Sequence, residues 1–575
     1  MPRRTLLGVL ATIAVLAAPV AAGAAPYTHT TQPVATGSGG SAATVDSVAT
    51  TAATNVLREG GNAVDAAVAA AAVLGVTEPF SAGIGGGGFM LIRTPDGETT
   101  TIDSREKAPA AMQPDSFMEN GTPLAFNDAR YSGLSGGVPG TVAGWDNALD
   151  EYGTWSLKRT LEPAIDVARE GFVIDQTFHA QAQGNAAYFD DIRSSEALYL
   201  DPDGTARDVG SVQRNPDMAR AYERIGHLGV KGFYRGAIAD ALVDAVQNPP
   251  LTADADHTWR PGLMTMRDLR AYTAPEREPT HVEYRDLDVY GMGPPSSGGS
   301  TDGEALNILE LEELGAMDRI RQLHWFLEAS RYAFADRNAC VADPEFYDVP
   351  LATLLSDGFA AQRNSLITER AATSPVAPGL NCPPAPTAPG GSTTHLTVAD
   401  AQGNVVSYTF TIESTGGNGI VVPGWGFLVN NELTDFNYDS LTHPNRADGG
   451  KRPRSSMAPT IVLDDGAPFL ATGSPGGSMI ITTVLQVLME RIDAGKTLPQ
   501  AIAEPRASQR NTAATAVEPA FRAQYEAGLS ARGHTFTTSA EIGAVTGIEF
   551  LPAGRMLAAA EPTRRGGGSA QVVRP

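Results

Sequence analysis

The stretch Gly390-Gly391-Ser392-Thr393-Thr394-His395-Leu396-Thr397-Val398-Ala399 decides the fold, because an irregular segment changes here into a strand. Residues 371–392 hold six prolines interleaved with alanine and glycine, a composition that forms neither helix nor sheet. Residues 394–399 and 405–412 then alternate with period two around turn residues at 400–404, which is typical of a β-hairpin. The sequence therefore predicts a flexible linker that leads directly into a hairpin.

The hairpin register brings two hydroxyl side chains together. A pairing centred on Gln402 places Thr393 opposite Thr411. Opposed residues in a sheet have Cβ atoms about 4.5–5.5 Å apart, which is within reach of a hydrogen bond between two hydroxyls. A bulge at Gly403 would shift this register by one residue.

Composition and charge restrict the class of protein. The chain has 575 residues, 42% of them apolar and 19% charged, which is typical of a folded globular protein. Its net charge of -23 would repel nucleic acid and anionic lipid, so we expect a small-molecule or peptide partner.

The first 24 residues have the pattern of an export signal. Arg3 and Arg4 precede an apolar run over 6–22, and Ala22-Gly23-Ala24 fits a cleavage site. The run is too short and too rich in alanine for a stable membrane span. We expect an exported protein, secreted, periplasmic or extracellular; the paired arginines leave both the Sec and the Tat route open.

The rest of the chain is predicted to form one α/β unit, and its sequence has no internal repeats. Apolar periodicity predicts helices over 46–58 and 63–74, separated by a Gly60-Gly61 stop. A strand is expected over 89–93. Further helical stretches cover 154–169 and 303–315.

Two short motifs match known signatures without their structural context. The GxGxxG pattern at 83–88 follows a predicted helix and precedes a strand, the reverse of a dinucleotide site. The GxSxG pattern at 133–137 has no strand before its serine, so it does not fit a nucleophile elbow. Both are interpreted as tight turns.

Metal binding has little support in the sequence. None of the nine histidines has metal-site spacing, so we expect no metal. The two cysteines, Cys340 and Cys382, could form one disulfide in an oxidising compartment or remain as two thiols.

Ten stretches, in this order, carry a resemblance to one family. They are GGNAVDAAVA (60–69), GIGGGGFM (83–90), DSREKAP (103–109), GGVPGTVAG (136–144), PPSSGG (294–299), ASRYAFADR (329–337), TTHLTVAD (393–400), NNELTDF (430–436), KRPRSSMAPT (451–460) and GSPGG (473–477). The chain resembles the gamma-glutamyltransferases, also called gamma-glutamyltranspeptidases or glutathione hydrolases, of the N-terminal nucleophile hydrolase superfamily.

The resemblance implies a fold and a maturation step. The expected fold is α/β (α+β), a four-layer αββα sandwich. The precursor would cut itself between Ser392 and Thr393, giving a large subunit (25–392) and a small subunit (393–575) that intertwine. Thr393 would then act as nucleophile and its new α-amine, with a reference pKa of about 7.7–8.0, as base. No cofactor is implied.

The resemblance also implies roles for other residues. Thr411 would support Thr393, and the backbone N–H groups of Gly476 and Gly477 would form an oxyanion hole. A gamma-glutamyl donor has an α-carboxylate and an α-ammonium. The carboxylate would be bound by Arg105, Ser455 and Ser456. The ammonium would be bound by Glu413, Glu432 and Asp435. Implied donors are glutathione and glutamine, and acceptors are water, amino acids or peptides.

The chain departs from the family pattern at several points. Arg454 stands where KRPLSSM would have leucine, and Glu413 and Glu432 are carboxylates where some relatives carry amides. The segment between Phe436 and Lys451 has 14 residues, too few for a lid loop, so an open cleft is expected. Two alternatives remain: a glutaryl or cephalosporin acylase of the same fold, and an unprocessed, inactive exported binding protein.

Overall fold

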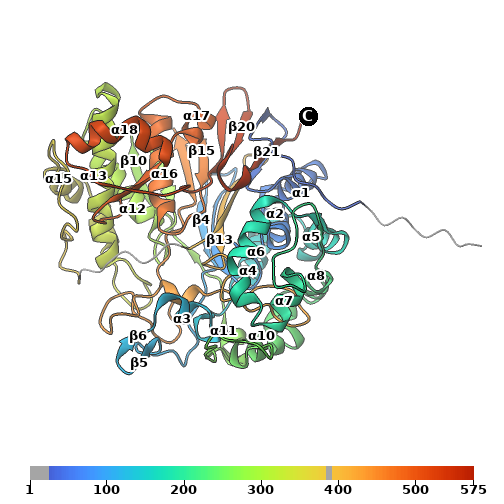
Figure 1. The fold of residues 1–575 in the computed structure, drawn as a ribbon. Helices are drawn as coiled ribbons and strands as arrows, with labels where there is room; N and C mark the ends of the chain where they lie inside the picture. The colour runs from blue at the N-terminus through green and yellow to red at the C-terminus, as the bar shows by residue number, and fades with distance from the viewer. Residues whose placement is uncertain (1–24, 384–390, 575) are drawn as a thin grey trace, which may run out of the picture.

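The computed structural model describes residues 25–383 and 391–574 (Figure 1). The predicted export signal and residues 384–390 of the predicted linker lie outside the described residues. Within the described residues no helix has the length and apolar character needed to cross a membrane.

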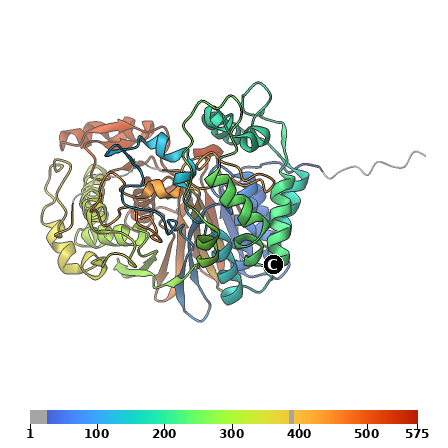
Figure 2. The same cartoon turned by 90° about the horizontal axis from the view of Figure 1, so that it is seen from below.

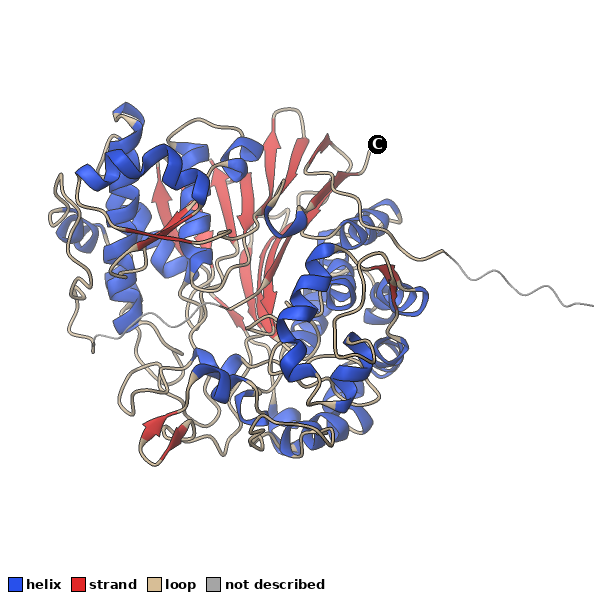
Figure 3. Ribbon diagram, viewed as in Figure 1, coloured by secondary structure: helices blue, strands red, loops and turns tan. Residues whose placement is uncertain are grey.

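Two seven-stranded antiparallel sheets form the centre of the molecule (Figure 3). The first sheet has the order β21-β2-β12-β13-β3-β4-β9 and the second the order β1-β20-β19-β15-β14-β11-β10. The first comprises β2 (Ser41–Thr44), β3 (Gly87–Arg93), β4 (Thr99–Asp103), β9 (Glu276–Arg277), β12 (Thr394–Ala399), β13 (Val405–Thr411) and β21 (Ser569–Val572). The second comprises β1 (Val34–Gly37), β10 (Thr280–Tyr284), β11 (Leu287–Gly291), β14 (Thr460–Asp464), β15 (Ala467–Gly473), β19 (Thr546–Leu551) and β20 (Arg555–Ala560).

Helices cover the outer face of each sheet (Figures 1 and 2). On the side of the first sheet lie α1 (Ser47–Arg58), α2 (Ala63–Thr77), α4 (Thr141–Tyr152), α5 (Leu157–Glu170), α6 (Gln176–Phe189), α7 (Arg193–Tyr199), α8 (Pro216–Leu228), α9 (Val230–Tyr234), α10 (Ala237–Gln247) and α11 (Met266–Ala271). On the side of the second lie α12 (Gly298–Glu310), α13 (Arg319–Cys340), α15 (Asp357–Asn364), α16 (Met479–Ile492), α17 (Leu498–Ala503) and α18 (Pro519–Ala531).

Three separate apolar cores hold these layers together. One core, which includes Leu91, Ile461 and Ile548, lies between the two sheets. A second packs the first sheet against α1, α2 and α5, and a third packs the second sheet against α12, α13 and α16. Each core removes apolar surface from water, so three cores join four layers. The expected αββα sandwich is confirmed.

The buried helix α2 shows how the sequence sets one layer. The Asn62 side chain accepts hydrogen bonds from the backbone N–H groups of Val64 and Asp65, and the Asp65 carboxylate accepts one from the Asn62 N–H, which forms a capping box. All 15 residues of α2 are buried, and their small alanine side chains let the helix lie close to β12 and β13.

Most predicted elements lie where they were expected, with shifted ends. The predicted helix over 154–169 begins at Leu157, because the Ser156 side chain caps it. The predicted helix over 303–315 instead spans Gly298–Glu310, so its position was wrong by about one turn. The glycine-rich segment 83–86 forms a turn before β3, and 133–135 is a 3-10 turn, as expected.

Segments on both sides of Ser392 build the same sheet. Strands β12, β13 and β21 come from residues after Ser392, and they pair with β2 and β3 from the earlier part of the chain. Breaking the chain at Ser392 would therefore leave two pieces held together by sheet hydrogen bonds and shared cores.

Candidate active site

Thr393 lies directly ahead of β12 and faces Thr411 at the end of β13. The register pairs Thr394 with Phe410, so the predicted alignment of the hairpin is confirmed without a bulge in the ladder. The Thr393 Oγ1 lies 3.3 Å from the Thr411 Oγ1. Both residues are buried, at 3% and 2% exposure.

The carbonyl of Ser392 contacts both hydroxyls. Thr393 Oγ1 donates a hydrogen bond to the Ser392 oxygen, and Thr411 Oγ1 donates to the same oxygen over 3.1 Å. The Glu413 N–H donates to Thr411 Oγ1 over 2.8 Å and so orients that hydroxyl. The Thr393 hydroxyl, which can act as a nucleophile, thus contacts the Ser392 carbonyl, and the Thr411 hydroxyl can polarise that carbonyl.

Arg565 and Ser81 also hold the Ser392–Thr393 peptide, and neither was predicted from the sequence. Arg565 donates from Nη1 to the Thr393 carbonyl over 2.6 Å and from Nη2 to Ser81 Oγ over 2.6 Å. The Ser81 hydroxyl lies 3.1 Å from Ser392 Oγ. Both contacts join residues more than 170 positions apart, so no local pattern could have predicted them.

Gly476 and Gly477 lie in the loop between β15 and α16. Their φ values are 131° and 56°, conformations that favour glycine. Among the described residues, neither N–H donates a hydrogen bond. Gly477 lines the same cavity as Thr393, whereas Gly476 lines the neighbouring one.

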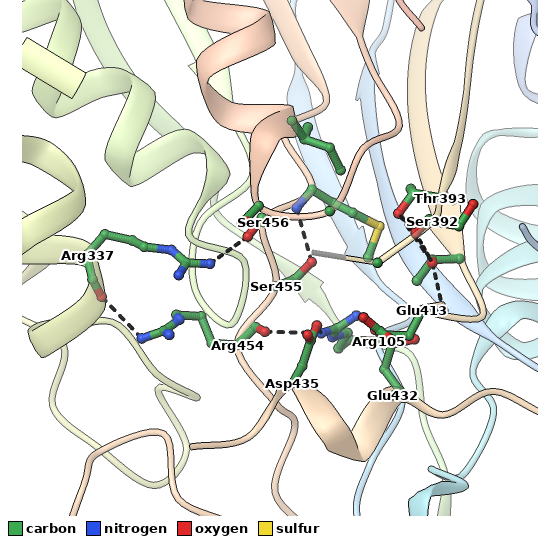
Figure 4. Close-up of a pocket in the computed structure, with 16 residues that line it drawn as sticks. Arg105, Arg337, Ser392, Thr393, Glu413, Glu432, Asp435, Arg454, Ser455 and Ser456 are labelled. Atoms are coloured by element: carbon green, nitrogen blue, oxygen red, sulfur yellow. Dashed lines mark hydrogen bonds and ion pairs between the residues drawn. The ribbon is translucent and has the colours of Figure 1, made fainter. Parts of the chain in front are cut away.

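The predicted substrate-binding residues line one cavity with Thr393 (Figure 4). Arg105 is 1% exposed; its guanidinium pairs with Glu432 and, over 2.6 Å, with Asp435. Burial alone lowers the pKa of Arg105, but these two carboxylates outweigh it and raise that pKa above its usual range. The structure brings together Arg105, Glu413, Glu432, Asp435, Ser455 and Ser456.

Two buried carboxyl groups here have pKa values near neutrality. Burial raises the pKa of Glu413 to about 7, and the neighbouring charge of Asp435 adds to the effect. Burial likewise raises the pKa of Glu106 to about 7, although Arg105 opposes the shift. Both groups therefore change between the neutral and the ionised form near neutral pH. A bound ammonium would favour the ionised form.

Ser455 and Ser456 are held by two other segments. The Ser297 hydroxyl donates to the Ser455 carbonyl over 2.5 Å. Arg337, on α13, donates from Nε to Ser297 Oγ over 2.9 Å and from Nη2 to Ser456 Oγ over 2.5 Å. The PPSSGG and ASRYAFADR stretches thus support the two serines, and Arg337 itself lines the cavity.

Arg454 points away from Arg105, towards the end of α13. Its Nη1 donates to the Arg337 carbonyl over 3.3 Å (Figure 4). It also donates to the carbonyls of Asn338 and Val341 over 3.1 and 3.3 Å. A cation at a helix C-terminus is favourable because the last carbonyls lack partners within the helix. Arg454 therefore caps α13, and its backbone carbonyl accepts from Arg105 over 3.1 Å.

The short segment 437–450 does not line the cavity. It folds onto itself through a hydrogen bond from the Asn437 N–H to the Asn445 carbonyl and onto α13 through His443 and the Asn338 carbonyl. Cys340 and Cys382 form a disulfide, which fixes the middle of the predicted linker (371–392) to the end of α13. Within the described ranges, no group of three His, Cys, Asp or Glu residues could hold a metal ion.

Comparisons with known proteins find relatives that match most of the chain. Residues 49–571 match the family described as Gamma-glutamyltranspeptidase. The chain is 37% identical to the Glutathione hydrolase proenzyme of Escherichia coli (strain K12), over 91% of this chain and 90% of that protein. It is 35% identical to the Acylase ACY 1 proenzyme of Pseudomonas sp. (strain V22), over 92% of each. It is also similar to the crystal structure of cephalosporin acylase from Bacillus halodurans, with a TM-score of 0.85 and 28% identity over 98% of this chain and 100% of that chain.

Proposed function

The chain belongs to the gamma-glutamyltranspeptidase family and is an enzyme of that family, and from this premise we propose how it matures and reacts. The chain is a precursor that cuts itself before Thr393 and then transfers gamma-glutamyl groups from glutathione or glutamine to water, amino acids or peptides. The contact of Thr393 Oγ1 with the Ser392 carbonyl carries this proposal.

Maturation begins with attack of Thr393 Oγ1 on the Ser392 carbonyl carbon. The C–N bond breaks, the acyl group passes to oxygen, and the nitrogen takes up the hydroxyl proton and becomes the α-amine of Thr393. Thr411 donates to the carbonyl oxygen as negative charge develops on it. Water then hydrolyses the ester, which releases Ser392 as the end of the large subunit (25–392) and Thr393 as the start of the small one (393–575).

The mature enzyme repeats the chemistry on a donor. The α-amine accepts the proton of Thr393 Oγ1, and the oxygen attacks the gamma-glutamyl carbonyl. The unused N–H groups of Gly476 and Gly477 are the proposed oxyanion donors. The amine of the donor leaves with the proton, and water or an amine acceptor then breaks the ester.

The charges of the cavity support a zwitterionic donor head. Arg105, Ser455 and Ser456 offer donors to the α-carboxylate, and Arg337 orients Ser456. Glu413, Glu432 and Asp435 offer carboxylates to the α-ammonium. Arg105 pairs with Glu432 and Asp435, whereas Glu413 forms no ion pair with a described residue, so a cationic group beside Glu413 would be favoured.

A second candidate function is a glutaryl or cephalosporin acylase, which the similarity to acylases favours. A glutaryl group lacks the α-ammonium, so the Glu413 carboxyl would face it without a cationic partner. We expect faster release of anilide from gamma-glutamyl anilide than from glutaryl anilide. Equal or reversed kcat/KM values would favour the acylase. An absence of both activities would favour the unprocessed binding protein.

We further propose that the protein is exported, because residues 1–24 have the composition of a signal. Retention of those residues on purified protein from the producing cell would contradict this proposal.

A further inference from the structure

A cavity of about 690 Å³ lies among α7, α8 and α10, on the side of the first sheet (Figure 1). Residues 193–250 contribute these helices and their connections, and the loop 421–426 completes the lining. We call it the α7–α8 cavity. It shares no lining residue with the two cavities that meet at Ser392. Sites that bind small molecules commonly have volumes of about 300–1,000 Å³.

Three arginines line the α7–α8 cavity without a carboxylate partner. They are Arg193, Arg207 and Arg214. Among residues 25–383 and 391–574, none of the three forms an ion pair, and the side chains of Arg193 and Arg214 make no hydrogen bond. Arg193 and Arg214 are also exposed, so a ligand that enters the cavity from solvent can reach both guanidinium groups.

Arg207 is half-buried and contacts only neutral acceptors. Its Nη2 donates to the Ala197 carbonyl over 3.1 Å, and its Nη1 donates to Gln213 Oε1 over 3.4 Å. Its Nε is buried and has no hydrogen-bond partner among the described residues. These contacts hold the guanidinium in place but leave its charge uncompensated. Burial of a charged group without a partner is unfavourable, so an anion beside Arg207 would be stabilising.

The acidic side chains that line the cavity do not balance these arginines. Asp217 lies 2.7 Å from a guanidinium nitrogen of Arg220, which is outside the lining. Asp244 accepts a hydrogen bond from the Asn248 amide over 3.0 Å. The lining therefore has an excess of positive charge, although the whole chain carries a net charge of -23. Local positive charge of this kind attracts anions.

Hydrogen bonds between distant segments fix the walls of the cavity. The Ser194 hydroxyl donates to the Val421 carbonyl over 2.6 Å, and the Asn215 side-chain amide donates to the Gly426 carbonyl over 2.7 Å. The first residue of each pair precedes Ser392 and the second follows it. The cavity is thus formed in advance of any ligand and is built from both of the proposed subunits.

We propose that the α7–α8 cavity binds a small multivalent oxyanion, either a polycarboxylate or a phosphate, through Arg207 together with Arg193 and Arg214. A guanidinium can donate two parallel hydrogen bonds to either kind of oxyanion. Three unpaired cations favour a ligand that carries at least two negative charges. The inference does not depend on the proposed transfer reaction, because the cavity is separate from the site beside Thr393.

Calorimetric titration of the purified full-length protein with citrate or with pyrophosphate, in low salt at neutral pH, tests this inference. We expect one saturable site per chain. Arg207→Gln should raise the Kd by about tenfold, the value of one hydrogen bond between charged groups. The double variant Arg193→Gln with Arg214→Gln changes exposed side chains only and should raise the Kd by a similar factor. Saturation by citrate alone identifies a polycarboxylate site, and saturation by pyrophosphate alone identifies a phosphate site.

Arg235→Gln serves as the matched control, because Arg235 is exposed and does not line the cavity. It removes the same charge and should keep the wild-type Kd. Three results would each overturn the inference: no saturable binding of either probe by the wild type, an equal loss of affinity in Arg235→Gln, and an unchanged Kd in the double variant. The double variant decides the matter even if Arg207→Gln fails to fold. Anilide release by the wild type reports separately on the proposed function.

Discussion

The Thr411 hydroxyl lies 3.3 Å from the Thr393 hydroxyl and 3.1 Å from the Ser392 carbonyl oxygen, so one side chain contacts both groups of the proposed cleavage. Thr411→Val removes this hydroxyl and keeps the β-branched shape that suits the strand. Loss of one donor to a developing oxyanion costs about 100-fold in rate, so we expect cleavage of the precursor to slow by that order. A time course on denaturing gels measures it. Thr411→Ser should cleave much faster than Thr411→Val; equal rates would contradict the role of the hydroxyl.

Arg454→Leu should loosen the end of α13. The change removes three contacts to backbone carbonyls in a buried position, so we expect a loss of roughly 2 kcal/mol in the free energy of unfolding. Because Arg337 loses an anchor and orients Ser456, the KM for the donor should rise more than kcat falls. Thermal unfolding and donor kinetics measure these effects, with Arg454→Lys as control. A variant with unchanged midpoint and KM would show that Arg454 is dispensable.

The disulfide should stabilise the precursor through its loop. Cys340 and Cys382 are 42 positions apart, and closing a loop of that size restricts the unfolded chain by about 4 kcal/mol at most. Cys340→Ser with Cys382→Ser should lower the thermal midpoint, and reductant should lower the wild-type midpoint similarly. A wild-type midpoint insensitive to reductant, together with an unchanged double variant, would contradict this expectation.

The KM for the donor should depend on pH near neutrality. Burial raises the pKa of Glu413 to about 7, so this group is mostly a neutral acid below that pH and mostly a carboxylate above it. An ammonium binds the carboxylate better, so KM should rise as pH falls from about 8 to 6. Glu106 titrates in the same range, so Glu413→Gln is needed to separate the two. That variant should have a higher KM with a weaker pH dependence; an unchanged profile would exclude Glu413 as the titrating group.

The hairpin and its threonine pair could be predicted because they follow from local rules. Strand alternation and a five-residue turn determine which residue faces Thr393, and the observed register agrees. The family resemblance predicted the αββα layers and several of the residues that line the cavity beside Thr393. The ends of helices were less predictable, since α5 begins at a side-chain cap that apolar periodicity does not reveal.

The residues that hold the site from a distance could not be predicted. Arg565 reaches the Thr393 carbonyl from the C-terminal segment, and Arg337 reaches the Ser456 hydroxyl from α13. Their roles depend on tertiary packing that no sequence spacing encodes. The pairing of Arg105 with Glu432 and Asp435 was also not expected, although the sequence analysis placed all three in one pocket.

The most direct test of the account is the mass of the purified chain with and without the Thr393 hydroxyl. The account predicts two fragments for the wild type, with the smaller one beginning at Thr393, and release of anilide from gamma-glutamyl anilide. It predicts one uncleaved chain without that activity for Thr393→Ala. An intact wild type that is active, or a Thr393→Ala protein that still cleaves itself or still releases anilide, would contradict it.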